Sequence, residues 1–99
     1  MTIITNAVIT AYCACALCCG KSNQPTAAGV MPKEHHTIAA PRWIPLGSRV
    51  RIKGLSWKFV VEDRTGRNYD GRFDVFIPNH EKALKFGIRT NKVTIVIKD

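Results

Sequence analysis

The chain has 99 residues, of which 45% are hydrophobic and 22% charged, so its composition fits one small folded domain and argues against disorder. No apolar run approaches the roughly 18 residues that a membrane-spanning helix needs. Fifteen Lys and Arg against seven Asp and Glu give a net charge of +8, which favours polyanionic partners such as anionic cell-wall polymers, nucleic acid or lipid surfaces. We expect a single domain over residues 1–99.

Short strands dominate the expected secondary structure. Residues 1–12 begin with β-branched side chains and lack the basic start and the cleavage site of a signal peptide, so they are typical of a strand. Residues 49–53 alternate strictly between polar and apolar, the pattern of a half-buried strand. Apolar runs at 57–61, 73–77 and 93–97 predict further strands, and glycines and prolines separate them.

One helix is predicted, at about residues 80–86. Asn79 can cap its N-terminus, Glu81 lies in its first turn and Gly87 can end it. Ala83 and Phe86 are three residues apart, so they share a face that can pack on the strands. Short strands, many turns and one small helix together predict a compact, mainly β barrel.

The four cysteines lie within seven residues, at Cys13, Cys15, Cys18 and Cys19. Four thiolates this close together can hold a structural zinc ion, although the usual zinc signature separates two ligand pairs by a longer loop. Alternatively, Cys13 and Cys15 pair with Cys18 and Cys19 in disulfide bonds, or the thiols stay free. These three states remain open. A cysteine nucleophile is the weaker interpretation, because nothing in the sequence places a histidine beside the cluster.

Two of the seven carboxylates are placed in or beside apolar strand residues. Asp74 lies inside the run at 73–77, and Asp63 follows the run that ends at Val61. Burial in an apolar strand disfavours the ionised form of a carboxyl group and raises its pKa, which suits a general acid near neutral pH. The structural alternative is that Asp74 faces solvent or pairs with Arg72 or Arg64.

Eight short motifs follow one another in the order of a known family. They are Thr10–Cys15, Cys18–Lys21, Thr26–Gly29, Ile38–Pro41, Ile44–Val50, Val61–Asp63, Gly71–Phe76 and Ala83–Gly87. Together they cover the chain from about Thr10 to Ile97, and they resemble the three-aspartate (3D) domain family. That family is similar to the catalytic barrel of membrane-bound lytic transglycosylase A. The resemblance implies a six-stranded double-psi β-barrel, in agreement with the barrel expected from the strands.

The resemblance also implies an activity, the cleavage of peptidoglycan glycan strands without water. One carboxylic acid protonates the glycosidic oxygen and then, as a carboxylate, takes the proton of the muramic acid C6 hydroxyl, which closes a 1,6-anhydro ring. Asp74 matches the family's principal acid. Asp63 matches the second aspartate, whose charge helps to keep Asp74 protonated. The chemistry needs no cofactor, so any zinc is structural, and the expected place of action is the bacterial cell wall.

Three positions depart from the family pattern: Ala40 replaces the first aspartate, Tyr69 a usual lysine, and Ala28 a serine. The arginines can contact the lactyl or peptide carboxylates of the substrate, and Tyr69 can stack on a sugar. The predicted substrate-binding residues are Thr26, Arg64, Arg67, Tyr69 and Arg72. Trp43 and Trp57 can also stack on sugars, although residues of this kind more often belong to the core of a domain this small. Tyr12 and Phe59 are assigned to the core.

Two other functions compete with the lytic enzyme. A non-catalytic peptidoglycan-binding barrel is favoured by Ala40, because a fold alone does not fix an activity. A basic nucleic-acid-binding barrel rests on net charge alone, and the basic residues form no contiguous arm. We therefore expect peptidoglycan glycan strands as the partner, no nucleic acid, and a monomer.

Overall fold

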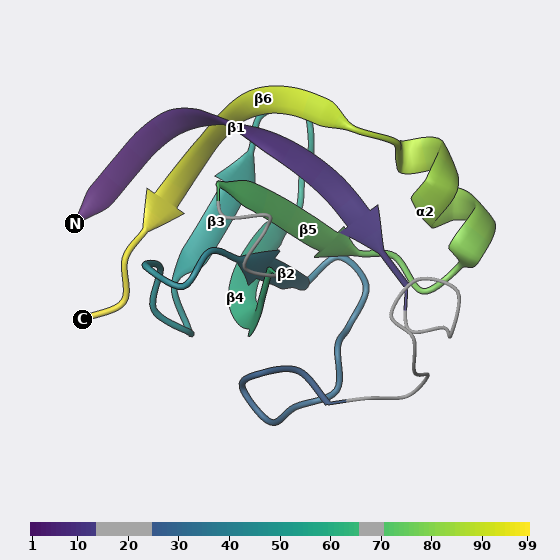
Figure 1. Ribbon diagram of the computed structural model, residues 1–99. Helices are drawn as coiled ribbons and strands as arrows, with labels where there is room; N and C mark the ends of the chain where they lie inside the picture. The colour runs from purple at the N-terminus through teal and green to yellow at the C-terminus, as the bar shows by residue number, and fades with distance from the viewer. Residues whose placement is uncertain (14–24, 66–70) are drawn as a thin grey trace.

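A closed, mainly β barrel is the architecture of this protein in a computed structural model (Figure 1), which describes residues 1–13, 25–65 and 71–99. Cys15, Cys18, Cys19, Arg67 and Tyr69 lie outside the described residues. The elements are β1 (Thr2–Tyr12), β2 (Thr37–Ala40), β3 (Arg49–Ile52), β4 (Lys58–Arg64), β5 (Arg72–Phe76), helix α2 (His80–Phe86) and β6 (Arg89–Val96). No helix in these ranges is long and apolar enough to cross a membrane.

The strand order around the barrel is β1-β5-β2-β4-β3-β6, so most neighbours are not consecutive in the chain. β1 runs parallel to β5 and β2 parallel to β4, whereas the four remaining pairs are antiparallel. The closed barrel of six strands confirms the predicted fold class. Two parallel pairs joined by crossing connections fit the expected double-psi topology.

The core fills the inside of the barrel because strand residues alternate between its two faces. In β3, Val50 and Ile52 are buried, while Arg49 and Arg51 are exposed. The predicted alternation at 49–53 is therefore confirmed, and similar alternation supplies core residues from β1, β5 and β6. Each fully buried valine or isoleucine contributes roughly 1.5–3 kcal/mol to folding.

Helix α2 has the bounds that its capping residues predict. The Lys82 N–H donates to the Asn79 side chain at 3.0 Å, and Gly87 ends the helix with a φ of 69°. Ala83 is buried and Phe86 half-buried, which confirms that they face the barrel. The helix packs on β1, near the end of that strand (Figure 1).

The aromatic residues only partly follow the sequence prediction. Phe59 is buried as expected, but Trp43 and Trp57 are 58% and 41% exposed, so the core position favoured for these two tryptophans is wrong. Their stacking on sugars stays a prediction. Trp57 lies in the connection before β4, outside the alternating part of the strand, and stacks on the ring of His35 with centroids 3.9 Å apart. Tyr12 is half-buried, and its hydroxyl group faces a carboxylate described below.

Candidate active site

Asp74 lies in the middle of β5, where the barrel positions it between two neighbouring strands. Its Cα pairs with that of Thr10 in β1 on one side and with that of Ala39 in β2 on the other. The adjacent residues Phe73 and Val75 point into the core, so Asp74 points away from it. The apolar run at 73–77, in which a carboxylate seemed out of place, is thus an ordinary half-buried strand.

The strand β1 gives each of two aspartates a hydroxyl group. Thr10 Oγ1 donates to Asp74 Oδ1, and the Tyr12 hydroxyl lies 3.4 Å from Asp63 Oδ2, within hydrogen-bond range. Because residues two apart on a strand share a face, both aspartates lie over the same face of β1. Within the described residues, no hydrogen bond engages Asp74 Oδ2.

Asp63, near the end of β4, is held by backbone donors as well. Its Oδ1 accepts from the Ala27 N–H at 3.1 Å and from the Arg64 N–H at 2.9 Å. Ala39 pairs with Asp63 on one side of β2 and with Asp74 on the other. Since neighbouring strands lie about 4.8 Å apart, the two aspartate backbones are separated by about 10 Å.

The electrostatic environment of Asp74 favours its neutral form. Burial raises the pKa of the Asp74 carboxyl above its ordinary value, and the negative charge of Asp63 raises it further. The guanidinium of Arg72, two residues away on β5, opposes the shift without cancelling it. The structure therefore brings together Asp63, Asp74 and Arg72, and the charge of Asp63 acts on Asp74 in the direction expected from the sequence.

Arg64 and Thr26 make contacts of another kind. Arg64 Nη1 donates to the carbonyl oxygens of Pro41 and Ile44, so its guanidinium fixes the conformation of the connection after β2. The buried Thr26 hydroxyl donates to the Val30 carbonyl at 2.7 Å and fixes the turn that presents the Ala27 N–H to Asp63. Both residues thus support the surroundings of Asp63, and their predicted contact with substrate stays a prediction.

Ala40, at the position of the family's first aspartate, is completely buried. Its methyl group belongs to the hydrophobic core, and its Cα pairs with that of Arg64. In the described part of the chain, the candidate site therefore contains two aspartates and no third carboxylate from this position.

Cys13 directly follows β1 and is fully buried and disulfide-bonded. Its Sγ lies 3.5 Å from His80 Nδ1, a proximity that the sequence could not show. The three other cysteines lie outside the described residues, so the state of the cluster as a whole stays a prediction. Among the residues that the structure describes, no group of three or more His, Cys, Asp or Glu side chains could hold a metal ion.

An apolar hollow of about 240 Å³ opens near this site without including either aspartate. Trp57, Phe59 and Phe76 supply aromatic walls, and Lys82 and Arg89 also line it. Phe76 follows Asp74 by two residues on β5, so it faces the same side of the strand. The sequence did not single out this hollow, because its residues come from four separate segments.

Comparison with known proteins gives one informative similarity, and no family model matches the chain. Over 93 residues the chain is 37% identical to a protein of Bacillus subtilis (strain 168) named "Putative cell wall shaping protein YabE". The match covers 88% of this chain and 21% of that protein, so the chain spans about a fifth of the length of its relative. The fold and the site define a small β-barrel with paired aspartates, similar to one segment of a longer protein.

Proposed function

We propose that this barrel acts on the bacterial cell wall and cleaves the glycan strands of peptidoglycan by lytic transglycosylation. The observation that carries the proposal is Asp74, an outward-facing carboxyl whose pKa is raised by burial and by Asp63. Such a group keeps its proton to a higher pH than an ordinary aspartate and can donate it to a glycosidic oxygen. The relative's name, a cell wall shaping protein, supports the wall as the place of action.

In the proposed reaction, Asp74 serves first as acid and then as base. The hydrogen bond from Thr10 holds Oδ1, and Oδ2 carries the proton. This proton passes to the glycosidic oxygen while the bond to the muramic acid C1 breaks and positive charge develops on the ring. The Asp74 carboxylate then takes the proton of the C6 hydroxyl, whose oxygen bonds to C1 and closes the 1,6-anhydro ring.

Asp63 has a positioning and electrostatic role in this scheme. Its contacts with Tyr12, Ala27 and Arg64 fix the carboxylate, and its charge adds to the rise in the pKa of Asp74 that burial causes. Arg72 acts in the opposite sense and stabilises the Asp74 carboxylate that forms after the first proton transfer. Because no water has to be activated, a second catalytic carboxylate is not required.

One observation favours a second candidate function, a peptidoglycan-binding barrel without activity. Ala40 contributes a buried methyl group where the resembled family has its first aspartate, so the site has lost a polar group. If that aspartate is needed for the chemistry, the remaining residues would still form a polar surface that can bind a glycan.

The test is mass spectrometry of the soluble products released from purified peptidoglycan sacculi. The wild type is compared with Asp74→Asn and with Asp99→Asn, a matched change at an exposed carboxylate. Anhydromuropeptides from the wild type and from Asp99→Asn, but not from Asp74→Asn, are the expected result. Products with reducing ends would indicate hydrolysis and contradict the proposed mechanism. Binding to sacculi without any release would leave the binding barrel as the function.

A further inference from the structure

We propose that the barrel has a second binding surface, a basic groove along β3 and β6 that binds a linear phosphodiester polymer of the cell wall. The basic groove is defined by five cationic side chains, Arg49, Arg51, Lys53, Lys92 and Lys98. The choice of a wall polymer rests on the proposed cell-wall role. The groove itself is independent of the aspartate site.

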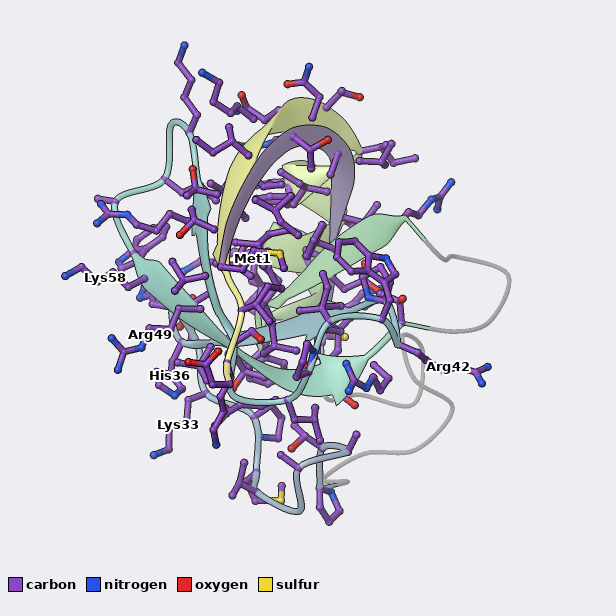
Figure 2. All side chains as sticks on the ribbon, turned by 90° about the vertical axis from the view of Figure 1, so that its left-hand side faces the viewer. Met1, Lys33, His36, Arg42, Arg49 and Lys58 are labelled. Carbon is purple, nitrogen blue, oxygen red and sulfur yellow. The ribbon has the colours of Figure 1, made fainter. Side chains whose placement is uncertain are left out.

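Strand geometry gathers these cations on one face. Arg49 and Arg51 point outward because Val50 and Ile52 occupy the core. Their strand pairs with β6, so that Arg51 lies opposite Thr94 and Arg49 opposite Val96. Figure 2 shows the Arg49 side chain pointing away from the barrel, on the same side as Lys58.

Two hollows follow each other along this β3–β6 ladder. The first, of about 310 Å³, is lined by Arg51, Lys53 and Lys92 together with Ile52, Gly54, Leu55 and Thr94. The second, of about 370 Å³, is lined by Arg49 and Lys98 together with Gly47, Val96 and Ile97. Gly47 shapes the second hollow, since a Cβ atom there would lie 2.6 Å from Lys98 Cδ. The two hollows lie next to each other along the ladder, because their arginines are two residues apart on one strand.

In the part of the chain that the structure describes, the basic groove contains no counter-charge. Neither hollow is lined by a carboxylate, and Asp99, which follows Lys98, lines neither. Within the described residues, the ion pairs that carboxylates form involve His35 and His36 and none of the five groove cations. Clustered cations without counter-charges attract a polyanion strongly and release bound counterions when it binds.

The spacing and the chemistry of the basic groove favour a polyol phosphate over a nucleic acid. Alternate residues along a strand lie about 7 Å apart, a separation that one three-carbon phosphodiester repeat can span. The two hollows have no aromatic lining residue, so they offer no platform on which bases could stack. A polymer with phosphates but no bases therefore matches the lining of the groove, which offers cationic side chains and no aromatic ring.

The groove and Asp74 lie on strands that are not neighbours in the barrel. β3 has β4 and β6 as neighbours, whereas β5, which carries Asp74, has β1 and β2. A phosphate polymer in the groove would leave the aspartate site accessible. The groove could thus hold the protein on the wall while glycan strands reach Asp74.

The experiment measures binding of a fluorescent poly(glycerol phosphate) oligomer by anisotropy at 50 and 200 mM salt. Five phosphate contacts predict that affinity falls about 100-fold between these two salt concentrations. Arg51→Gln combined with Lys53→Gln should weaken binding roughly tenfold at the lower salt concentration and reduce the dependence on salt. The matched control, Lys82→Gln with Lys85→Gln, removes the same charge from α2 and should retain at least half of the wild-type affinity.

Asp74→Asn should bind the oligomer as the wild type does, even if the proposed activity fails, so the two proposals are tested separately. Lys92→Gln with Lys98→Gln replaces the first pair of changes if circular dichroism shows that pair to be unfolded. Equal losses in the α2 control, or salt-independent binding, would overturn the proposal. So would tighter binding of an oligothymidylate with the same number of phosphates, because the occupant would then be a nucleic acid.

Discussion

The hydrogen bond between Thr10 and Asp74 gives the most direct test of the candidate site. Thr10→Val removes the hydroxyl group but keeps the shape and the β-branched character of the side chain. Thr10→Ser keeps the hydroxyl group and removes a methyl group. Because Thr10 is half-buried, both variants lose a comparable amount of stability, about 1 kcal/mol, from a hydrogen bond in one case and from apolar contact in the other.

The two Thr10 variants should differ in activity despite similar stability. Without the Thr10 hydroxyl, Asp74 Oδ1 loses its hydrogen bond and the orientation of Oδ2 is no longer fixed. We therefore expect Thr10→Val to release products up to about 100-fold more slowly than the wild type. Thr10→Ser should stay within a few-fold of the wild type. For a chain of this size, a loss of about 1 kcal/mol lowers the melting temperature by about 4–8 °C, which calorimetry can verify for both variants.

Release rates are measured as anhydromuropeptides formed from sacculi at a temperature well below both melting transitions. Wild-type rates from Thr10→Val would refute the role of this hydrogen bond in aiming the acid. Equal losses in both variants would also refute it, because stability rather than the hydroxyl group would then control the rate.

Three further predictions concern charge and packing. Asp74→Asn should stabilise the fold at pH 7, because the raised pKa of Asp74 means that ionising this carboxyl opposes folding. In denaturant titrations the gain in stability should vanish below pH 3.8, the ordinary pKa of the group. A gain that is the same at every pH would contradict this prediction. Asp63→Asn removes a charge that raises the pKa of Asp74, so the alkaline limb of the pH–activity profile should move to lower pH; an unmoved limb would show that the two groups are not coupled. Ile95→Ala in the core should cost about 2–5 kcal/mol in urea unfolding, whereas Ile88→Ala, at a side chain 72% exposed, should cost less than about 0.5 kcal/mol.

Local patterns in the sequence predicted the helix, five of the six strands and the class of fold. They missed β2, because its four residues are all buried and show no polar–apolar alternation. The alternation at 49–53 and the capping residues of the 80–86 helix are set by neighbours in the chain, so they can be read directly. The embedded position of Asp74 also pointed to a raised pKa before the structure showed its causes.

The partners of the aspartates could not be predicted in the same way. Thr10 meets Asp74 only through the parallel register of β1 and β5, which joins residues 64 positions apart. From the sequence, Tyr12 is assigned to the core, whereas in the structure Tyr12 is half-buried and its hydroxyl lies 3.4 Å from Asp63 Oδ2. A face shared by Thr10 and Tyr12 could have suggested both contacts, had the pairing of the strands been known.

The strand order has a consequence for how this chain folds. Both neighbours of β1, β5 and β6, come from the last third of the sequence, so the first strand made is among the last to be paired. During synthesis the edge of β1 that pairs with β6 stays unpaired until residues near Val96 have left the ribosome. An unpaired strand edge is a template for misassembly. Closure by β6 also pairs the second edge of β3 and completes the basic groove, so the barrel and its cationic face arise in one late step.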